Sequence, residues 1–199
     1  FDDNYDYDKY LNLKEKYLTL KPKQPTLFYT HNLLPGHSQN SGKCIPNEKK
    51  NYFKRVKKAN NEMKDDIKNL KNNDPDAIII LVSDHGPYLT KNCGQLLGMN
   101  KSSINKYDIQ DRYGVFLAIS WPKGMKNHVN NIEISQDIFP AILSNITSNK
   151  NLFDKLKLKR EFFDGFNNTV SGINIKNGIL KGGKNDGEPL FENRSYKLK

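Results

Sequence analysis

The continuous apolar run Ala77-Ile78-Ile79-Ile80-Leu81-Val82 leads directly into Ser83-Asp84-His85-Gly86. A β-branched run of this length, bounded by polar residues, predicts a strand that is apolar on both faces. Such a strand is typical of the centre of a parallel sheet that helices cover on both sides.

Two segments upstream complete a predicted βαβ unit. Residues 26–30 (Thr-Leu-Phe-Tyr-Thr) are β-branched and aromatic, which predicts a buried strand. Residues 49–72 predict a helix, because apolar side chains recur there at steps of three and four residues: Tyr52, Val56, Ala59, Met63, Ile67 and Leu70. The unit is then strand 26–30, helix 49–72 and strand 77–82.

Further along the chain, residues 114–120 predict another strand, and a helix is expected from Ser135 or Asp137 to Leu143. We expect an α/β fold: an α/β/α sandwich with a mostly parallel sheet and a small C-terminal appendage. The expected organisation is a lead-in segment at 1–25, the α/β domain at 26–145, and an extension at 146–199. Apolar and polar residues alternate weakly in this extension, which suggests a small antiparallel sheet.

Composition excludes several classes of protein. The chain has 199 residues, 32 basic against 22 acidic, and a formal net charge of +10. No apolar run approaches the roughly 20 residues that span a bilayer. Two cysteines exclude a disulfide-dense scaffold and a four-cysteine zinc site. The chain opens at Phe1 without a methionine and carries no signal peptide, so we interpret it as a piece of something longer.

Asp84 and His85 come immediately after the predicted central strand. Ligands of open α/β sheets bind beyond the carboxyl ends of the strands. A carboxylate and an imidazole suit a divalent metal such as Zn²⁺ or Mn²⁺, and Gly86 permits a turn at positive φ that lets both reach one ion. The alternative is a capping aspartate beside a surface histidine.

His31 and His37 lie in the loop after the other strand of the predicted unit. Both loops then open on the same edge of the sheet. Two histidines there can donate hydrogen bonds to a phosphate-like anion or ligate a second metal. The alternative is a pair of solvated loop histidines.

The segment Ile79–Gly86 resembles the "V-S-D-H-G" metal-binding signature of the alkaline phosphatase–sulfatase superfamily. Residues 28–37 resemble the "H-x-x-x-P-H" element of sulfatase-like hydrolases, although Gly36 is inserted between the proline and His37. Residues 115–122 resemble the strand that ends in "W-P", and residues 135–143 resemble the "D-x-x-P-T-L" helix. The four elements occur in the family's order across residues 26–145, and the resemblance does not extend to 146–199.

The resemblance implies a metal-dependent hydrolase or transferase that acts on phosphate or sulfate esters. It implies a divalent metal (Zn, Mn, Ca or Mg) on Asp84 and His85, and substrate contact by His37, with His31 as the second candidate. The family's nucleophile and first acidic ligands have no counterpart here, so the resemblance implies that this chain is the C-terminal portion and is inactive without the N-terminal half. Related transferases are membrane-anchored, so the resemblance implies that this protein lies on the periplasmic or extracellular face of a membrane.

Three alternatives stay open on the sequence. Cys44 and Cys93 either pair or are free thiols. A non-catalytic sulfatase-like scaffold would show no metal dependence. A nucleic-acid-binding domain would account for the net charge, but the lysines are scattered and arginine occurs only four times, so we expect no nucleic-acid partner.

Overall fold

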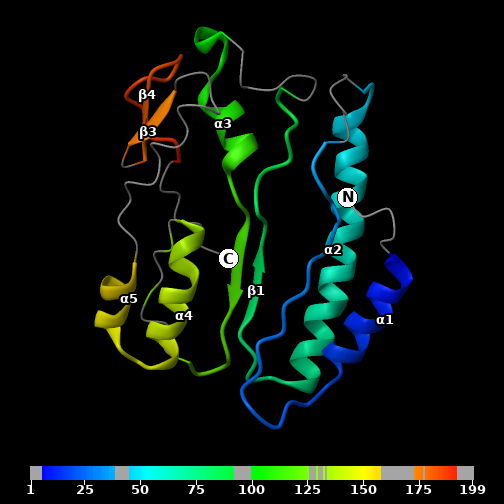
Figure 1. Ribbon diagram of the computed structural model, residues 1–199. Helices are drawn as coiled ribbons and strands as arrows, with labels where there is room; N and C mark the ends of the chain where they lie inside the picture. The colour runs from blue at the N-terminus through cyan, green and yellow to red at the C-terminus, as the bar shows by residue number, and fades with distance from the viewer. Residues whose placement is uncertain are drawn as a thin grey trace. The chain divides into compact units, whose positions relative to one another are not determined.

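A computed structural model of the protein describes residues 6–38, 45–91, 100–125, 129, 132, 134–157, 173–176 and 178–191. The described elements, in chain order, are α1 (Tyr7–Leu18), α2 (Glu48–Asn73), β1 (Ile79–Val82), a 3₁₀ turn (Lys101–Ser103), α3 (Lys106–Tyr113), β2 (Leu117–Ser120), a second 3₁₀ turn (Ser135–Asp137), α4 (Ile138–Ile146), α5 (Lys150–Leu156), β3 (Asn174–Lys176) and β4 (Ile179–Lys181) (Figure 1).

The chain forms two compact units that interleave along the sequence. The first contains residues 1–36, 50–81 and 118–125. The second contains residues 37–49, 82–117 and 126–199. Each unit is described by itself below.

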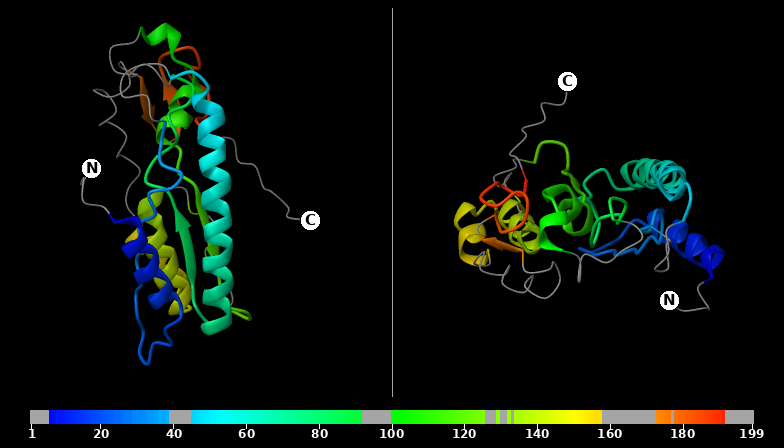
Figure 2. Two further views of the ribbon diagram at one scale, coloured as in Figure 1. Left: turned by 90° about the vertical axis from the view of Figure 1, so that its right-hand side faces the viewer. Right: turned by 90° about the horizontal axis from the view of Figure 1, so that it is seen from above.

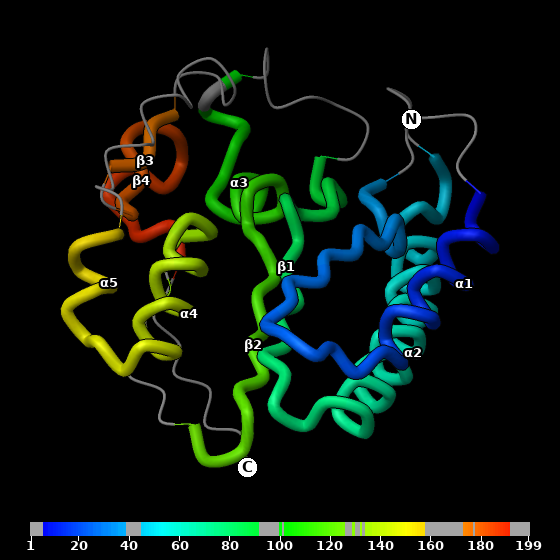
Figure 3. The backbone as a smooth tube through the Cα atoms, turned by 60° about the horizontal axis from the view of Figure 1, so that its bottom comes forward, coloured from blue at the N-terminus to red at the C-terminus, as the bar shows by residue number. Residues whose placement is uncertain are grey.

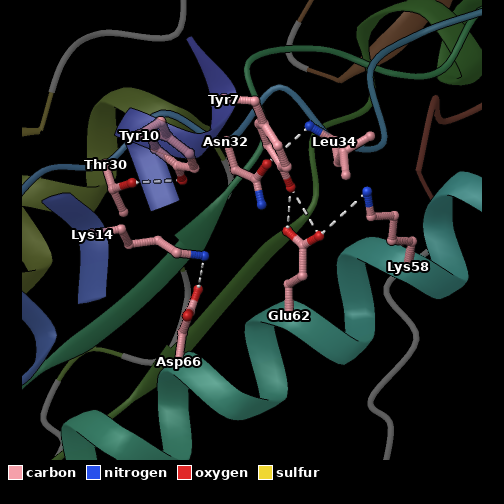
Figure 4. A network of polar contacts seen from close by, with 9 residues as sticks. All are labelled: Tyr7, Tyr10, Lys14, Thr30, Asn32, Leu34, Lys58, Glu62 and Asp66. Carbon is pink, nitrogen blue, oxygen red and sulfur yellow. Dashed lines mark hydrogen bonds and ion pairs between the residues drawn. The ribbon is translucent and has the colours of Figure 1, made fainter. Parts of the chain in front are cut away.

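In the first unit, α1 and the long helix α2 lie side by side (Figures 1 and 3). Polar contacts join them along their length (Figure 4). The Tyr7 hydroxyl lies 2.9 Å from both carboxylate oxygens of Glu62. Two turns further along α1, Lys14 Nζ lies 2.8 Å from Asp66 Oδ2. A tyrosine–carboxylate hydrogen bond and a lysine–aspartate ion pair therefore join α1 to α2.

The first unit also contains most of a small sheet made of β1 and β2. In Figure 1 the two arrows run in opposite directions, so the strands are antiparallel. Figure 2 shows α2 running along this sheet. Side chains of α2 and of both strands line a small, mostly apolar hollow.

The predicted parallel α/β/α sandwich is wrong. The described residues form a mixed helical protein with five α-helices and two separate two-stranded antiparallel sheets, β1–β2 and β3–β4, and no parallel sheet. Residues 26–30 are extended but form no strand, because their backbone has no ladder partner. Leu27 and Tyr29 are 79% and 80% exposed, whereas the prediction needed them buried. Without this strand the predicted βαβ unit does not form.

The second unit has its core between α3 and the C-terminal sheet. Strands β3 and β4 pair antiparallel, with Ile175 opposite Leu180, and an isolated bridge joins Ile179 to Pro189. The buried cluster comprises Ile104, Ile109, Ile173, Ile175, Leu180 and Leu190, with Tyr113 packed against it. Helices α4 and α5 are also in contact in this unit (Figure 3).

Helix α3 lies between the predicted strands 77–82 and 114–120, where the sequence predicts no helix. Asn105 begins the helix with a capping box: its side chain accepts from the backbone of Tyr107 and Asp108, and the Asp108 side chain accepts from the backbone N–H of Asn105. Ile109 is 1% exposed and ties the helix to the core. This short helix positions the candidate site.

Candidate functional site

The loop after β1 is anchored on the C-terminal half of α3. Gly86 N–H donates to the Arg112 carbonyl at 3.0 Å, and Tyr88 N–H donates to the Asp111 carbonyl at 3.3 Å. The Asp111 carboxylate also accepts from the backbone N–H and the hydroxyl of Thr90, at 2.9 and 3.2 Å. The loop that carries Asp84 and His85 is therefore fixed at three alternate residues, Gly86, Tyr88 and Thr90.

Gly86 has a different role from the one that the sequence predicts. Its φ is not in the left-handed region, so no turn at positive φ occurs there. A Cβ at this position would lie 2.1 Å from the Asp111 carbonyl oxygen. Glycine is needed here because the loop backbone packs directly against α3. The positive φ in this loop belongs to Tyr88, at +63°.

The loop that carries His37 reaches the same place. Ser38 N–H donates to the Pro87 carbonyl at 2.8 Å, which ties residues 37–38 to the loop after β1. The imidazole centroids of His37 and His85 are 5.8 Å apart. The two histidines are thus brought together, although the shared sheet edge that predicted it is absent.

Tyr88 completes a cluster of three rings. Its ring is stacked on His85 with centroids 4.8 Å apart and planes 16° apart. It is also stacked on His37, at 5.4 Å and 26°. Aromatic contacts at these distances favour one orientation of the rings.

Hydrogen bonds to neighbouring carbonyls define the tautomer of each imidazole. His37 Nδ1 lies 2.6 Å from the Ser38 carbonyl oxygen, and His85 Nδ1 lies 2.8 Å from the Gly86 carbonyl oxygen. A carbonyl oxygen only accepts, so each Nδ1 carries the proton and each neutral ring keeps its lone pair on Nε2. In this tautomer Nε2 is the nitrogen that can ligate a metal, and it donates to an anion only when the ring is protonated.

Asp84 and His85 have the geometry of two ligands of one cation. Asp84 Oδ2 lies 3.5 Å from His85 Nε2. Two tetrahedral zinc ligands at about 2.1 Å from the ion are roughly 3.4 Å apart. The other carboxylate oxygen, Oδ1, accepts from the His85 backbone N–H at 3.0 Å, which fixes the carboxylate. The Asp84 side chain is 81% exposed and open to a partner.

The remaining ligands of such a cation are not supplied by the part of the chain that the structure describes. Within it, no group of three or more histidine, cysteine, aspartate or glutamate side chains is close enough to hold a metal. Asp84 and His85 are therefore the two candidate ligands that the described residues bring close together.

Arg112 supports the cluster. Its guanidinium carbon is 4.3 Å from the Tyr88 ring centroid, and Nη2 donates to the Lys91 carbonyl at 3.2 Å. Burial raises the pKa of the Tyr88 phenol above its usual 10.0, and Arg112 lowers it in part, while Tyr113 and Asp84 raise it further. The phenol is consequently neutral at physiological pH.

The sequence did not single out Tyr88 or Arg112. Tyr88 lies four residues after Asp84, and that proximity was the only available signal. His31 belongs to the first unit, whereas His37, Asp84 and His85 belong to the second. Cys44 and Cys93 lie outside the described residues, so their pairing stays a prediction.

The hollow in the first unit is separate from this chemistry. Its volume is about 180 Å³, and it is lined by Ile67, Lys71, Ile79, Leu81, Ala118, Ile119 and Ser120. None of these side chains is an acid or a histidine. The ring cluster of the second unit is therefore the better candidate site.

Comparisons with known proteins returned nothing: no family model, no curated protein and no solved structure matches this chain. None of the helices in the described ranges combines the length and the apolar character needed to cross a bilayer.

Proposed function

We propose that this chain is part of a metal-dependent enzyme that hydrolyses or transfers phosphate or sulfate esters. Asp84 and His85 bind a divalent cation, and His37 contacts the anionic ester. The observation that carries the proposal is the 5.8 Å approach of the His37 and His85 rings, from loops far apart in sequence, beside the Asp84 carboxylate, whose Oδ2 lies 3.5 Å from His85 Nε2.

The residues of this chain would bind the cation and orient the anionic ester. His37 offers Nε2 toward an anion and donates there when it is protonated. The Asp84 carboxylate and His85 Nε2 would hold the cation. A divalent cation at this position would polarise the ester oxygens and lower the pKa of a bound hydroxyl nucleophile.

The nucleophile and the further metal ligands are proposed to come from an N-terminal half of the same protein, as the sequence resemblance implies. By the same resemblance we propose a site on the periplasmic or extracellular face of a membrane. The +10 net charge suits an anionic substrate without choosing phosphate over sulfate.

Metal titration tests the proposal directly. We expect Zn²⁺ or Mn²⁺ to bind the purified chain in calorimetry, and Asp84→Ala to weaken binding by roughly tenfold or more, because a ligand is lost. Asp154→Ala is the matched control, since Asp154 is an exposed carboxylate of the same unit whose partner is Lys157, on α5's C-terminal side.

Two outcomes would overturn the proposal. Equal affinity in wild type and Asp84→Ala would place the metal elsewhere. No binding by wild type, either alone or in the longer protein, would favour the non-catalytic scaffold.

A further inference from the structure

Tyr88 adopts an uncommon backbone conformation at the centre of the candidate site. Its φ of +63° lies in the left-handed region, which non-glycine residues rarely adopt and bulky ones least of all. Such strain persists only where the surroundings fix it, and it clusters at functional sites. The conformation therefore calls for a reason in the contacts of this side chain.

Those contacts are made with the two candidate histidines and with α3. The ring stacks on His85 and His37 at 4.8 and 5.4 Å, and Arg112 lies 4.3 Å from its centroid. The backbone N–H of Tyr88 donates to the Asp111 carbonyl. Helix α3 thus holds the tyrosine, and the tyrosine in turn contacts both imidazoles.

The imidazoles need such a support. Rotation about the bond to an aromatic ring is broad and roughly two-fold, so a loop histidine readily exchanges the places of its nitrogens. In each ring Nδ1 donates to the carbonyl oxygen of the following residue. A flat ring packed on both imidazoles restricts that rotation and keeps Nε2 on the binding side.

We propose that Tyr88 is a positioning residue that holds His85 and His37 in their binding orientation. This inference rests on the proposed function, because the orientation of Nε2 matters only where these histidines bind a cation and an anion. It assigns the role to the ring of Tyr88 and not to its hydroxyl.

Three variants test the proposal. Tyr88→Phe keeps the ring, Tyr88→Leu removes it while keeping a side chain at the same positive φ, and Tyr107→Leu is the control, since Tyr107 is 61% exposed on α3. Tyr88→Asn, which tolerates positive φ, gives a second ring-free variant if Tyr88→Leu lowers the melting temperature.

The first readout needs no metal. In the NMR spectrum of the metal-free chain, we expect the imidazole Cε1–H signals of His37 and His85 to be shifted by the tyrosine ring current in wild type, Tyr88→Phe and Tyr107→Leu. In Tyr88→Leu both signals should move toward the position of a solvated imidazole and broaden. Unchanged signals in a folded Tyr88→Leu or Tyr88→Asn variant would overturn the inference.

The second readout is zinc affinity by calorimetry. We expect a roughly tenfold loss in Tyr88→Leu, as is typical when support behind a metal ligand is removed, and less than a twofold change in Tyr88→Phe. An equal loss in Tyr88→Phe would move the role to the hydroxyl and overturn the inference. If no variant binds zinc, the proposed function fails, and the NMR comparison still decides the role of Tyr88.

Discussion

Lys14 Nζ lies 2.8 Å from Asp66 Oδ2, and the lysine side chain is only 6% exposed. A buried lysine on the inner face of α1 reaches a carboxylate on α2, while Leu13 and Tyr17 of the same helix are 45% and 48% exposed. A shielded ion pair therefore lies between α1 and α2.

Lys14→Met should destabilise the first unit by about 2 kcal/mol, because it leaves the Asp66 carboxylate without its cation in a partly buried place. Urea denaturation measures the loss. Lys16→Met makes the same chemical change at an exposed position of α1 and should stay within about 0.5 kcal/mol of wild type. Equal stability of the two variants would show that the ion pair does not hold α1.

Gly86→Ala should destabilise the protein by about 2 kcal/mol, because the new Cβ would meet the Asp111 carbonyl oxygen at 2.1 Å and force the loop away from α3. The His85 imidazole signals should shift as well. Gly124→Ala is the contrast, since nothing lies within 4 Å of its Cβ and only its φ of +85° opposes the change, at about 1 kcal/mol. A stable Gly86→Ala variant with unshifted His85 signals would contradict the close approach.

Some of the elements follow from local sequence pattern. The predicted helix 49–72 is confirmed as α2, Glu48–Asn73. The prediction succeeded because a long apolar stripe at steps of three and four residues indicates a helix and does not fit a strand. The runs at 77–82 and 114–120 are confirmed as strands in β1 and β2. Local pattern is reliable where many residues agree.

The sheet could not be predicted in the same way, because strand pairing is a non-local choice. An apolar run on its own does not say which strand lies beside it or in which direction. The prediction supplied 26–30 as a parallel neighbour, whereas β1 pairs with β2 in antiparallel orientation. Helix α3 was missed because it is short, and its stability comes from the Asn105 cap and from Ile109.

In the candidate site, too, local sequence pattern predicted some residues and missed those whose roles depend on packing. Asp84 and His85 were found because adjacent metal-binding residue types follow a strand. Tyr88 and Arg112 were missed because their roles arise from packing: a positive φ at Tyr88 and a guanidinium over its ring. Neither feature can be recognised from the order of residues in the sequence.

Ile109→Ala should cost about 3 kcal/mol, and Ile109→Val about 1 kcal/mol, because Ile109 is 1% exposed in the cluster that joins α3 to β3 and β4. Thermal and urea denaturation measure the series. Tyr107→Ala, on the exposed side of α3, is the control and should change stability by less than about 0.5 kcal/mol. A cost in Ile109→Ala no larger than in the control would mean that the C-terminal sheet does not pack on α3.

The pKa of Glu188 should lie below its ordinary value of 4.5, mainly because Lys106 Nζ donates to its carboxylate at 2.8 Å, with a further hydrogen bond from Asn185. A carboxylate whose pKa is lowered in the folded state favours folding above the ordinary pKa, and the effect is lost as pH falls through the folded-state pKa. Carboxyl ¹³C NMR titration of Glu188 measures the shift. Lys106→Met should return the pKa most of the way toward 4.5, and Lys184→Met, at an exposed lysine of the same loop, should leave it unchanged. A wild-type pKa at or above 4.5 would show that the Lys106–Glu188 contact between α3 and the residues after β4 is not formed in solution.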